Sequence, residues 1–286
     1  MPELPEVEAL ARRLTERTAG REVTRVEVAS VAALQTFDPP VEALIGRRVL
    51  RWERRGKYLC LESLGGPWLV VHLARSGWLR WREELSELRA RPGKGPLALR
   101  VGFGREGFEL TEVATEKRLG IWVVHDLQEV EGLARLGIDA LSEQLTVDAL
   151  ARLAEQHKGH VKALLVDQSA IAGVGNAYSD EVLHAARLSP FKPASHLDRD
   201  ELARLHAALV GVLTDALERT IDLGEDRLKD DKRKAMAVHG RAGSPCPVCG
   251  DIVRSVSFAA KSWQYCPTCQ TGGRQLADRR LSRLLR

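Results

Sequence analysis

Four of the five cysteines lie in two Cys-x-x-Cys pairs near the C-terminus, and this spacing restricts the local fold more than any other feature. The pairs are Cys246 with Cys249 and Cys266 with Cys269, and sixteen residues separate them. Two such pairs at this separation close a tetrahedral site in which four thiolates bind one zinc ion on a β-hairpin. Four thiolates leave no open coordination position, so we expect a structural metal that holds a hairpin over residues 252–264.

Composition narrows the class of protein. The 286 residues suffice for two domains, and a net charge of +4 with a pI near 8.9 permits nucleic-acid binding without requiring it. No apolar run approaches the roughly 20 residues of a membrane span, and the N-terminus lacks the pattern of a signal peptide. Four clustered cysteines and a single separate one, Cys60, favour metal binding in a reducing compartment over a disulfide framework. Cys60 stands among apolar residues and is expected to be buried and unreactive.

Hydrophobic periodicity divides the chain into two parts. Residues 2–18 follow a helical pattern that stops at Gly20. From about 22 to 125 the period is two, and turns rich in Gly and Pro separate short strands, which is typical of a sandwich or a barrel. The strand-like segments are 26–28, 58–61, 68–73, 97–103 and 121–124.

After about residue 130 the pattern becomes helical. The expected helices start after a Thr146 cap and continue near 161–166, 177–188 and 202–217. Before the third of these helices, Gly173 and Gly175 permit a tight turn with exposed backbone N–H groups. The charged segment 224–236 is expected to be a mobile loop.

The first residues offer a candidate nucleophile. If Met1 is removed, Pro2 presents a secondary amine that can add to an aldehyde carbon and form a charged iminium. An α-amino group titrates at about 7.7–8.0, so a useful fraction is free base near neutral pH. Glu3 and Glu6 place carboxylates beside it. Proline and acidic residues are also favoured in the first turn of any helix, so this segment alone favours a structural role.

Several further short motifs follow one another along the chain. Considered singly, Lys57 is typical of a solvated basic turn and Asn176 of a turn residue. The stretches are Pro2-Glu3-Leu4-Pro5-Glu6-Val7-Glu8, Arg55-Gly56-Lys57, His72-Leu73-Ala74-Arg75-Ser76-Gly77, Asp167-Gln168 leading into Ala172-Gly173-Val174-Gly175-Asn176-Ala177-Tyr178, and Val238-His239-Gly240-Arg241. Together with the cysteine pairs they resemble the formamidopyrimidine-DNA glycosylase/endonuclease VIII (Fpg/Nei) family over almost the whole chain. Their order and spacing are specific, and the proline opening followed by Leu4 favours the Fpg branch.

The resemblance implies an α+β fold in which an N-terminal helix lies on a β-sandwich, followed by a helix–two-turn–helix domain and a zinc-finger hairpin. The implied boundaries are 1–130 for the catalytic sandwich domain, 131–145 for a linker, 146–236 for the helical DNA-binding domain, 237–272 for the zinc finger and 273–286 for an Arg-rich tail. That tail is either an extra phosphate-binding arm or a solvated terminus.

By the same resemblance the protein is a bifunctional DNA glycosylase and AP lyase of base excision repair that acts on damaged, in the first place oxidised, bases. The damaged nucleotide is flipped out of the duplex. Pro2 attacks its C1′ atom, Glu3 transfers protons, and Glu6 orients the site. The resulting iminium acidifies C2′, and β,δ-elimination cuts the strand. Lys57 and Asn176 hold phosphates around the flipped nucleotide.

Further DNA contacts follow from the family pattern, with departures. Lys162 matches a basic position near the lesion, and Gly173 and Gly175 let the backbone approach a phosphate. Fpg proteins fill the gap left by the flipped base with Met, Arg and Phe, where this chain has Arg75, Lys117 and Leu119. Lys261 replaces an Arg of the zinc hairpin and lacks its bidentate fork. The segment 224–236, which caps the lesion in Fpg, is short and without aromatics, so a preference for oxidised purines is open.

Two alternatives stay open at this point. One is a non-enzymatic protein whose zinc ribbon and helical domain bind damaged DNA. The other is a family member that acts mainly on abasic sites, oxidised pyrimidines or bulky adducts. In each case the expected partner is damaged double-stranded DNA, with no membrane, and we expect a monomer in the bacterial cytoplasm, associated with the nucleoid.

Overall fold

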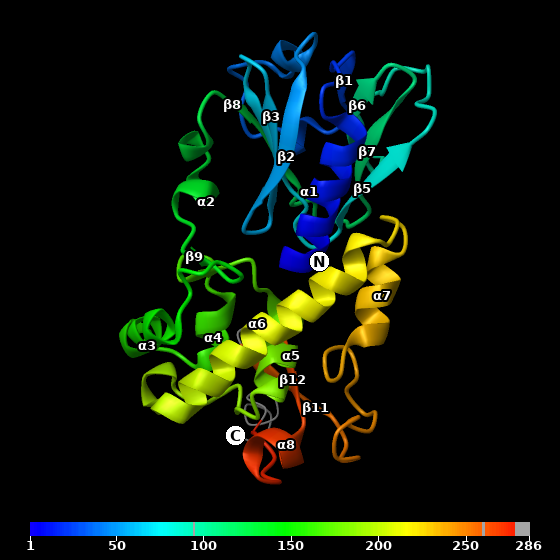
Figure 1. The fold of residues 1–286 in the computed structure, drawn as a ribbon. Helices are drawn as coiled ribbons and strands as arrows, with labels where there is room; N and C mark the ends of the chain where they lie inside the picture. The colour runs from blue at the N-terminus through cyan, green and yellow to red at the C-terminus, as the bar shows by residue number, and fades with distance from the viewer. Residues whose placement is uncertain (94, 259–260, 278–286) are drawn as a thin grey trace, which may run out of the picture. The chain divides into compact units, whose positions relative to one another are not determined.

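The computed structural model describes residues 1–93, 95–258 and 261–277 (Figure 1). The chain divides into two compact units, each assembled from two stretches. The first unit comprises Met1–Arg135 and Leu217–Lys229, and the second comprises Leu136–Ala216 and Asp230–Arg286. The Arg-rich tail predicted for 273–286 lies outside the described residues from 278 onward.

The first unit is an antiparallel sandwich with one long helix packed on it, as the period-two pattern predicts. Its helices are α1 (Leu4–Thr18) and α2 (Glu131–Ala134), and its strands are β1 (Arg25–Val28), β2 (Val49–Arg55), β3 (Tyr58–Ser63), β4 (Trp68–His72), β5 (Gly77–Arg82), β6 (Leu97–Phe103), β7 (Glu106–Glu112) and β8 (Gly120–Val124). One sheet has the strand order β1-β6-β7-β5 and the other has the order β2-β3-β4-β8. Both predicted features, the helix and the sandwich, are confirmed.

The apolar stripe of α1 explains why the helix packs on the sheets. Val7, Leu10 and Leu14 recur at helical spacing and are buried in one core with residues of both sheets. The indole of Trp52 on β2 donates a hydrogen bond to Thr18 Oγ1 at 3.1 Å and contacts Phe108 edge to face. Fully burying one such side chain contributes about 1.5–3 kcal/mol, so this stripe fixes where the N-terminus of α1 lies on the sandwich.

The second unit is helical and ends in a zinc-finger hairpin. Its elements are β9 (Ile138–Asp139), α3 (Val147–Gln156), α4 (Val161–Val166), β10 (Ile171–Ala172), α5 (Asn176–Ala185), β11 (Arg254–Phe258), β12 (Lys261–Tyr265) and α8 (Pro267–Thr271). Thr146 Oγ1 accepts a hydrogen bond from Ala149 N at 3.1 Å, which confirms the predicted cap of α3. Helices α6 (Arg199–Ile221) and α7 (Leu228–Ala235) each contribute residues to both units.

The prediction of a mobile loop at 224–236 is wrong, because residues 228–235 form helix α7. Acidic residues lie in its first turn and basic residues in its last, an order that the helix dipole favours. The segment before it is anchored to the first unit. Leu228 is buried in the sandwich core, and Glu225 accepts hydrogen bonds from Arg13 and from Trp81 N, both at 3.1 Å. Charge and polarity alone do not reveal these anchors.

Within the described ranges, no helix combines the length and the apolar character needed to cross a lipid bilayer.

Candidate active site and metal centre

The N-terminus of α1 brings two carboxylates next to Pro2. Glu3 is the N-cap residue, and Glu6 Oε2 accepts a hydrogen bond from Glu3 N at 2.7 Å in a capping-box arrangement. Both glutamates are 1% exposed, and Pro2 is buried as well. The side chain of Glu6 therefore fixes the main chain of Glu3, the residue that directly follows Pro2.

Lys57 lies in the β2–β3 turn, and this turn is tied to α1. Gly56 precedes it with φ +55°, a backbone conformation that favours glycine. Arg54 Nε pairs with Glu8 Oε2 of α1 at 3.0 Å. Lys57 is 8% exposed. Burial, and after it the charge of Lys57, lowers the pKa of His72 to about 4, so this histidine is neutral at physiological pH.

His72 is a residue to which the sequence motifs gave no role of its own. It stands opposite Tyr58 in the β3–β4 register, and the two rings lie 4.7 Å apart. The sequence does not show that His72 lies near Lys57, because this depends on the pairing of β3 with β4. Its place in the His72–Gly77 motif was the one available sign that His72 belongs to the site.

The three candidate gap-filling residues lie in different environments. Arg75 is exposed in the turn between β4 and β5, after Ala74 with φ +48°. Lys117 lies in the loop between β7 and β8, and its Nζ donates a hydrogen bond to Gly95 O at 2.6 Å. Leu119 is 2% exposed and belongs to the sandwich core. Burial just before β8 stabilises the apolar side chain of Leu119 in this structure, and its role as a wedge stays a prediction.

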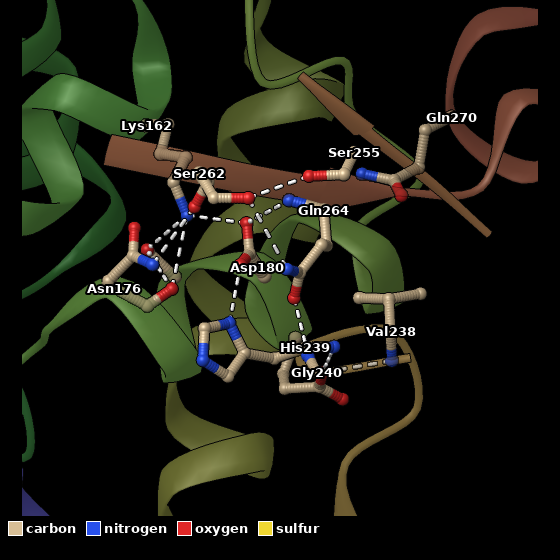
Figure 2. Close-up of polar contacts among 12 residues, drawn as sticks. Lys162, Asn176, Asp180, Val238, His239, Gly240, Ser255, Ser262, Gln264 and Gln270 are labelled. Carbon is tan, nitrogen blue, oxygen red and sulfur yellow. Dashed lines mark hydrogen bonds and ion pairs between the residues drawn. The ribbon is translucent and has the colours of Figure 1, made fainter. Parts of the chain in front are cut away.

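Lys162 and Asn176 meet in the second unit (Figure 2). Lys162 Nζ on α4 contacts Asp180 Oδ1 at 2.5 Å, Ser179 Oγ at 2.9 Å and Asn176 O at 3.1 Å. The lysine and Asp180 side chains are both 0% exposed. A buried charge needs such a partner. The ammonium group of Lys162 is enclosed in this structure and holds α4 against α5, and its contact with DNA stays a prediction.

Asn176 is the first residue of α5 and contacts the zinc hairpin. Its Nδ2 donates to Ser262 O at 3.1 Å (Figure 2). Its Oδ1 is buried and has no hydrogen-bond partner in the described part of the chain. The amide donor that was expected to hold a phosphate is thus already engaged by β12.

Two adjacent acids on α5 were missed by the sequence analysis. Asp180 also accepts from His239 Nδ1 at 2.7 Å and from Gln264 N at 3.2 Å (Figure 2). Glu181 accepts from the backbone N–H groups of residues 237–239 at distances between 2.7 and 3.0 Å. Burial raises the pKa of Glu181. Two adjacent acids in the middle of a predicted helix were the available signal, because such groups are rarely buried without partners.

We predict that Asp180→Asn lowers the free energy of unfolding by about 3–5 kcal/mol, because it leaves the Lys162 ammonium buried without its counter-ion. Urea titration of the zinc-loaded protein, followed by circular dichroism, measures this loss. The matched control is Asp148→Asn, whose exposed pair with Arg199 contributes at most about 1 kcal/mol. Equal losses in both variants would contradict the structural role given to the buried pair.

In the glycine turn before α5, backbone groups form hydrogen bonds with a side chain of the same segment. Gly173 has φ +103°, and its N–H donates to Gln168 Oε1 at 3.0 Å. Gln168 Nε2 in turn donates to Val174 O at 2.8 Å. Gly175 is the N-cap residue of α5. The backbone N–H groups of this turn were expected to be exposed, and the geometry directs that of Gly173 to Gln168; the approach of a phosphate to Gly173 and Gly175 stays a prediction. Lys261 opens β12, and its side chain lies outside the described residues.

The four clustered cysteines form the metal centre. Their Sγ atoms all lie within 4.8 Å of one another, and the Sγ distances of Cys246–Cys269 and Cys249–Cys266 are 3.9 and 3.4 Å. A tetrahedral zinc site with bonds of about 2.3 Å requires sulfur atoms about 3.8 Å apart. The residues therefore fit one structural zinc ion, as the spacing predicts. Desolvation raises the pKa of Cys266 to about 11, so a thiolate there needs a neighbouring cation.

Local hydrogen bonds and one histidine support this centre. Gly250, with φ +77°, lets the chain turn so that its N–H donates to Cys246 O at 2.9 Å. His184 Nε2 on α5 lies 3.3 Å from Cys246 Sγ. Cys60, in contrast, is buried in β3, and burial raises its pKa to about 12, in agreement with an unreactive thiol.

Comparison with known proteins places these features in one family. The model of the formamidopyrimidine-DNA glycosylase N-terminal domain matches residues 1–119, that of the formamidopyrimidine-DNA glycosylase H2TH domain matches 136–225, and that of a zinc finger found in Fpg and IleRS matches 243–272. A formamidopyrimidine-DNA glycosylase of Thermus thermophilus is 36% identical over 284 residues, which cover 96% of this chain and 100% of that protein. A formamidopyrimidine-DNA glycosylase-like protein of Mycobacterium tuberculosis is 58% identical over 128 residues, 45% of this chain and 81% of that protein.

The fold agrees with the sequence comparison. The crystal structure of the MutM (Fpg) protein from Thermus thermophilus is similar, with a TM-score of 0.79 and 33% identity. The match covers 94% of this chain and 98% of that chain.

Proposed function

Because the chain belongs to the formamidopyrimidine-DNA glycosylase (Fpg/Nei) family, it is a DNA glycosylase of base excision repair, and we propose that Pro2 is its nucleophile. The observation that carries this proposal is the N-terminus of α1, where buried Glu3 follows Pro2 and Glu6 holds the main chain of Glu3. A free amine and an adjacent acid are the pair that excision through a Schiff base needs.

In the proposed reaction, the Pro2 nitrogen forms a bond to C1′ of the damaged nucleotide and the bond from C1′ to the base breaks. Glu3 supplies a proton to the sugar ring oxygen or to the departing base. The Pro2 nitrogen loses its proton, the bond from C1′ to the ring oxygen breaks, and the opened sugar carries the iminium. The iminium acidifies the C2′ proton, whose loss expels the 3′ phosphate. A second elimination expels the 5′ phosphate, and water then releases Pro2. Each step requires that Met1 has been removed, because an amide nitrogen is not nucleophilic.

We also propose how the protein holds its substrate. Damaged duplex DNA is the partner, and Lys57, Arg75, Lys117 and Lys261 supply positive charge toward its phosphates or its gap. We propose Asn176 as a further contact to a DNA phosphate, made either by the backbone of its turn or by its side-chain amide after that amide leaves Ser262. The protein works as a monomer, which size-exclusion chromatography checks, and it acts where the DNA is, on the bacterial nucleoid in the cytoplasm.

We predict that sodium borohydride traps the protein covalently on duplex DNA that contains an abasic site. Reduction of the iminium to a stable amine should yield one adduct per protein, mapped to Pro2 by peptide mass spectrometry. The intact mass of the same preparation should equal the sequence without Met1. Binding of the DNA with neither adduct nor strand cleavage would favour the non-enzymatic alternative instead.

A second substrate class is favoured by the gap-filling residues. Arg75 is an exposed cation where Fpg proteins have an apolar filler, and Leu119 is buried. This combination supports abasic sites, oxidised pyrimidines or bulky adducts over oxidised purines. Single-turnover excision from a panel of lesion duplexes, each with all four opposing bases, distinguishes these classes.

A further inference from the structure

Glu112, the last residue of β7, is a buried acid with no role in the reaction described above. It is 2% exposed. Oε1 accepts hydrogen bonds from Ser76 Oγ at 3.1 Å and from Arg118 N at 2.9 Å. Oε2 accepts from Arg118 N at 3.1 Å and from Leu119 N at 3.0 Å. All of these donors are neutral groups, so this carboxylate is held by backbone N–H groups and one hydroxyl.

These hydrogen bonds join two segments that are far apart in sequence. Ser76 lies in the turn that carries Arg75, and Leu119 ends the loop that carries Lys117. Glu112 is paired with Gly77 in the β5–β7 register, and its own N–H donates to Pro96 O at 2.7 Å. The carboxylate therefore lies at the base of both the turn and the loop.

The charged residues of the two segments also interact electrostatically. Arg118 pairs with Glu116 at 2.6 Å on the exposed side of the loop. The pKa of Glu116 is lowered first by its hydrogen bond to Arg118 and also by the charge of Arg75. The charge of Arg75 on the turn thus acts on Glu116 of the loop, while the Lys117 ammonium group donates to Gly95 O at 2.6 Å.

A buried carboxylate is costly, and it persists where its hydrogen bonds hold something in place. A loop between two strands does not need a buried charge at its base in order to close. We propose that Glu112 is a positioning residue that fixes the separation between the Arg75 turn and the Lys117 loop, so that both reach the gap left by the extruded nucleotide. This proposal rests on the proposed glycosylase function.

The first test measures the placement of the loop and needs no DNA. In zinc-loaded full-length protein, Glu112→Gln replaces one acceptor with an NH₂ group that faces a backbone donor. We expect tryptic cleavage after Lys117 or Arg118 to become about tenfold faster, because the cost of opening the loop falls. Glu106→Gln is the matched control, since Glu106 lies on the same strand and pairs with Arg21. An unchanged cleavage rate in Glu112→Gln would overturn the proposal.

The second test measures function in two reactions. Excision of a damaged base from duplex DNA should fall about tenfold in Glu112→Gln, because extruding a stacked base needs the gap to be filled. Cleavage at a pre-formed abasic site should stay close to that of the unmodified protein, since little unstacking is required there. If both rates stay the same, or both fall equally, the positioning role is wrong.

The two hypotheses fail in different ways. If the unmodified protein neither excises a base nor forms a borohydride adduct, the proposed function is wrong, while the proteolysis result still reports on Glu112. Should Glu112→Gln not fold, Ser76→Ala removes only the hydroxyl donor and tests the same connection. Its expected effect is smaller but has the same pattern: faster cleavage of the loop, slower excision and unchanged abasic-site cleavage.

Discussion

Glu3→Gln is expected to slow base excision by about 10²–10⁴-fold, the range that one general acid contributes. Glutamine keeps the length and polarity of the side chain but has no carboxylic proton to give to the sugar oxygen or the departing base. The backbone hydrogen bond from Glu3 N to Glu6 is retained, so α1 should still begin at the same residue. Single-turnover excision at saturating protein measures the effect without interference from DNA release.

The control for this variant is Glu16→Gln, an exposed position on the same helix where the identical substitution should change neither excision nor stability. Pro2→Gly is the companion variant, and it should also remove excision, because it loses the buried ring that orients the amine. Glu3→Gln should still form a borohydride adduct with an abasic aldehyde, since Pro2 remains. Normal excision by either N-terminal variant would refute the assigned roles.

Local patterns in the sequence were sufficient for the elements that depend on local rules. The stripe of α1 predicted its buried face, strict alternation predicted β6, and Thr146 predicted the start of α3. The spacing of the cysteines predicted the metal centre. In each case the residues that decide the structure lie within about twenty positions of one another.

The segment before the zinc finger could not be predicted in the same way. Its polarity suggested a loop, yet Leu228 inserts into the sandwich core and Glu225 pairs with Arg13, more than two hundred residues earlier. These contacts belong to tertiary structure, and they are what allow α7 to form and residues 217–229 to join the first unit. No local window contains the information that establishes them.

Motif position alone did not show which of the candidate DNA-contacting side chains are buried. Lys162 matched a DNA-contacting position, but Asp180, eighteen residues later, draws its ammonium into the interior. Leu119 matched a wedge, but the strand that follows it places its side chain in the core. Residue identity therefore predicted which functional groups are present at these positions. The packing of distant elements determined whether those groups are exposed to solvent.

Cys246→Ser is expected to abolish stoichiometric zinc binding and, with it, the hairpin formed by β11 and β12. Structural zinc contributes about 10–16 kcal/mol of apparent binding free energy in small zinc fingers, so three thiolates and a hydroxyl cannot hold the metal equally well. Cys246 also lies 3.3 Å from His184 on α5, so its loss removes a link between the metal centre and the helix that begins at Asn176. We expect loss of duplex binding in fluorescence anisotropy, together with a zinc content near zero.

Cys60→Ala is the matched control, because it removes a cysteine that lies in a β-strand outside the cluster. It should keep one zinc per chain and bind DNA normally. The N-terminal chemistry does not use the metal, so Cys246→Ser protein at high concentration should still give a trace of borohydride adduct on abasic DNA. Such a residual adduct would show that zinc acts through binding and not through the reaction at Pro2. Full zinc content and unchanged affinity in Cys246→Ser would contradict a four-cysteine site, and they would require another ligand, for which neighbouring His184 is the first candidate.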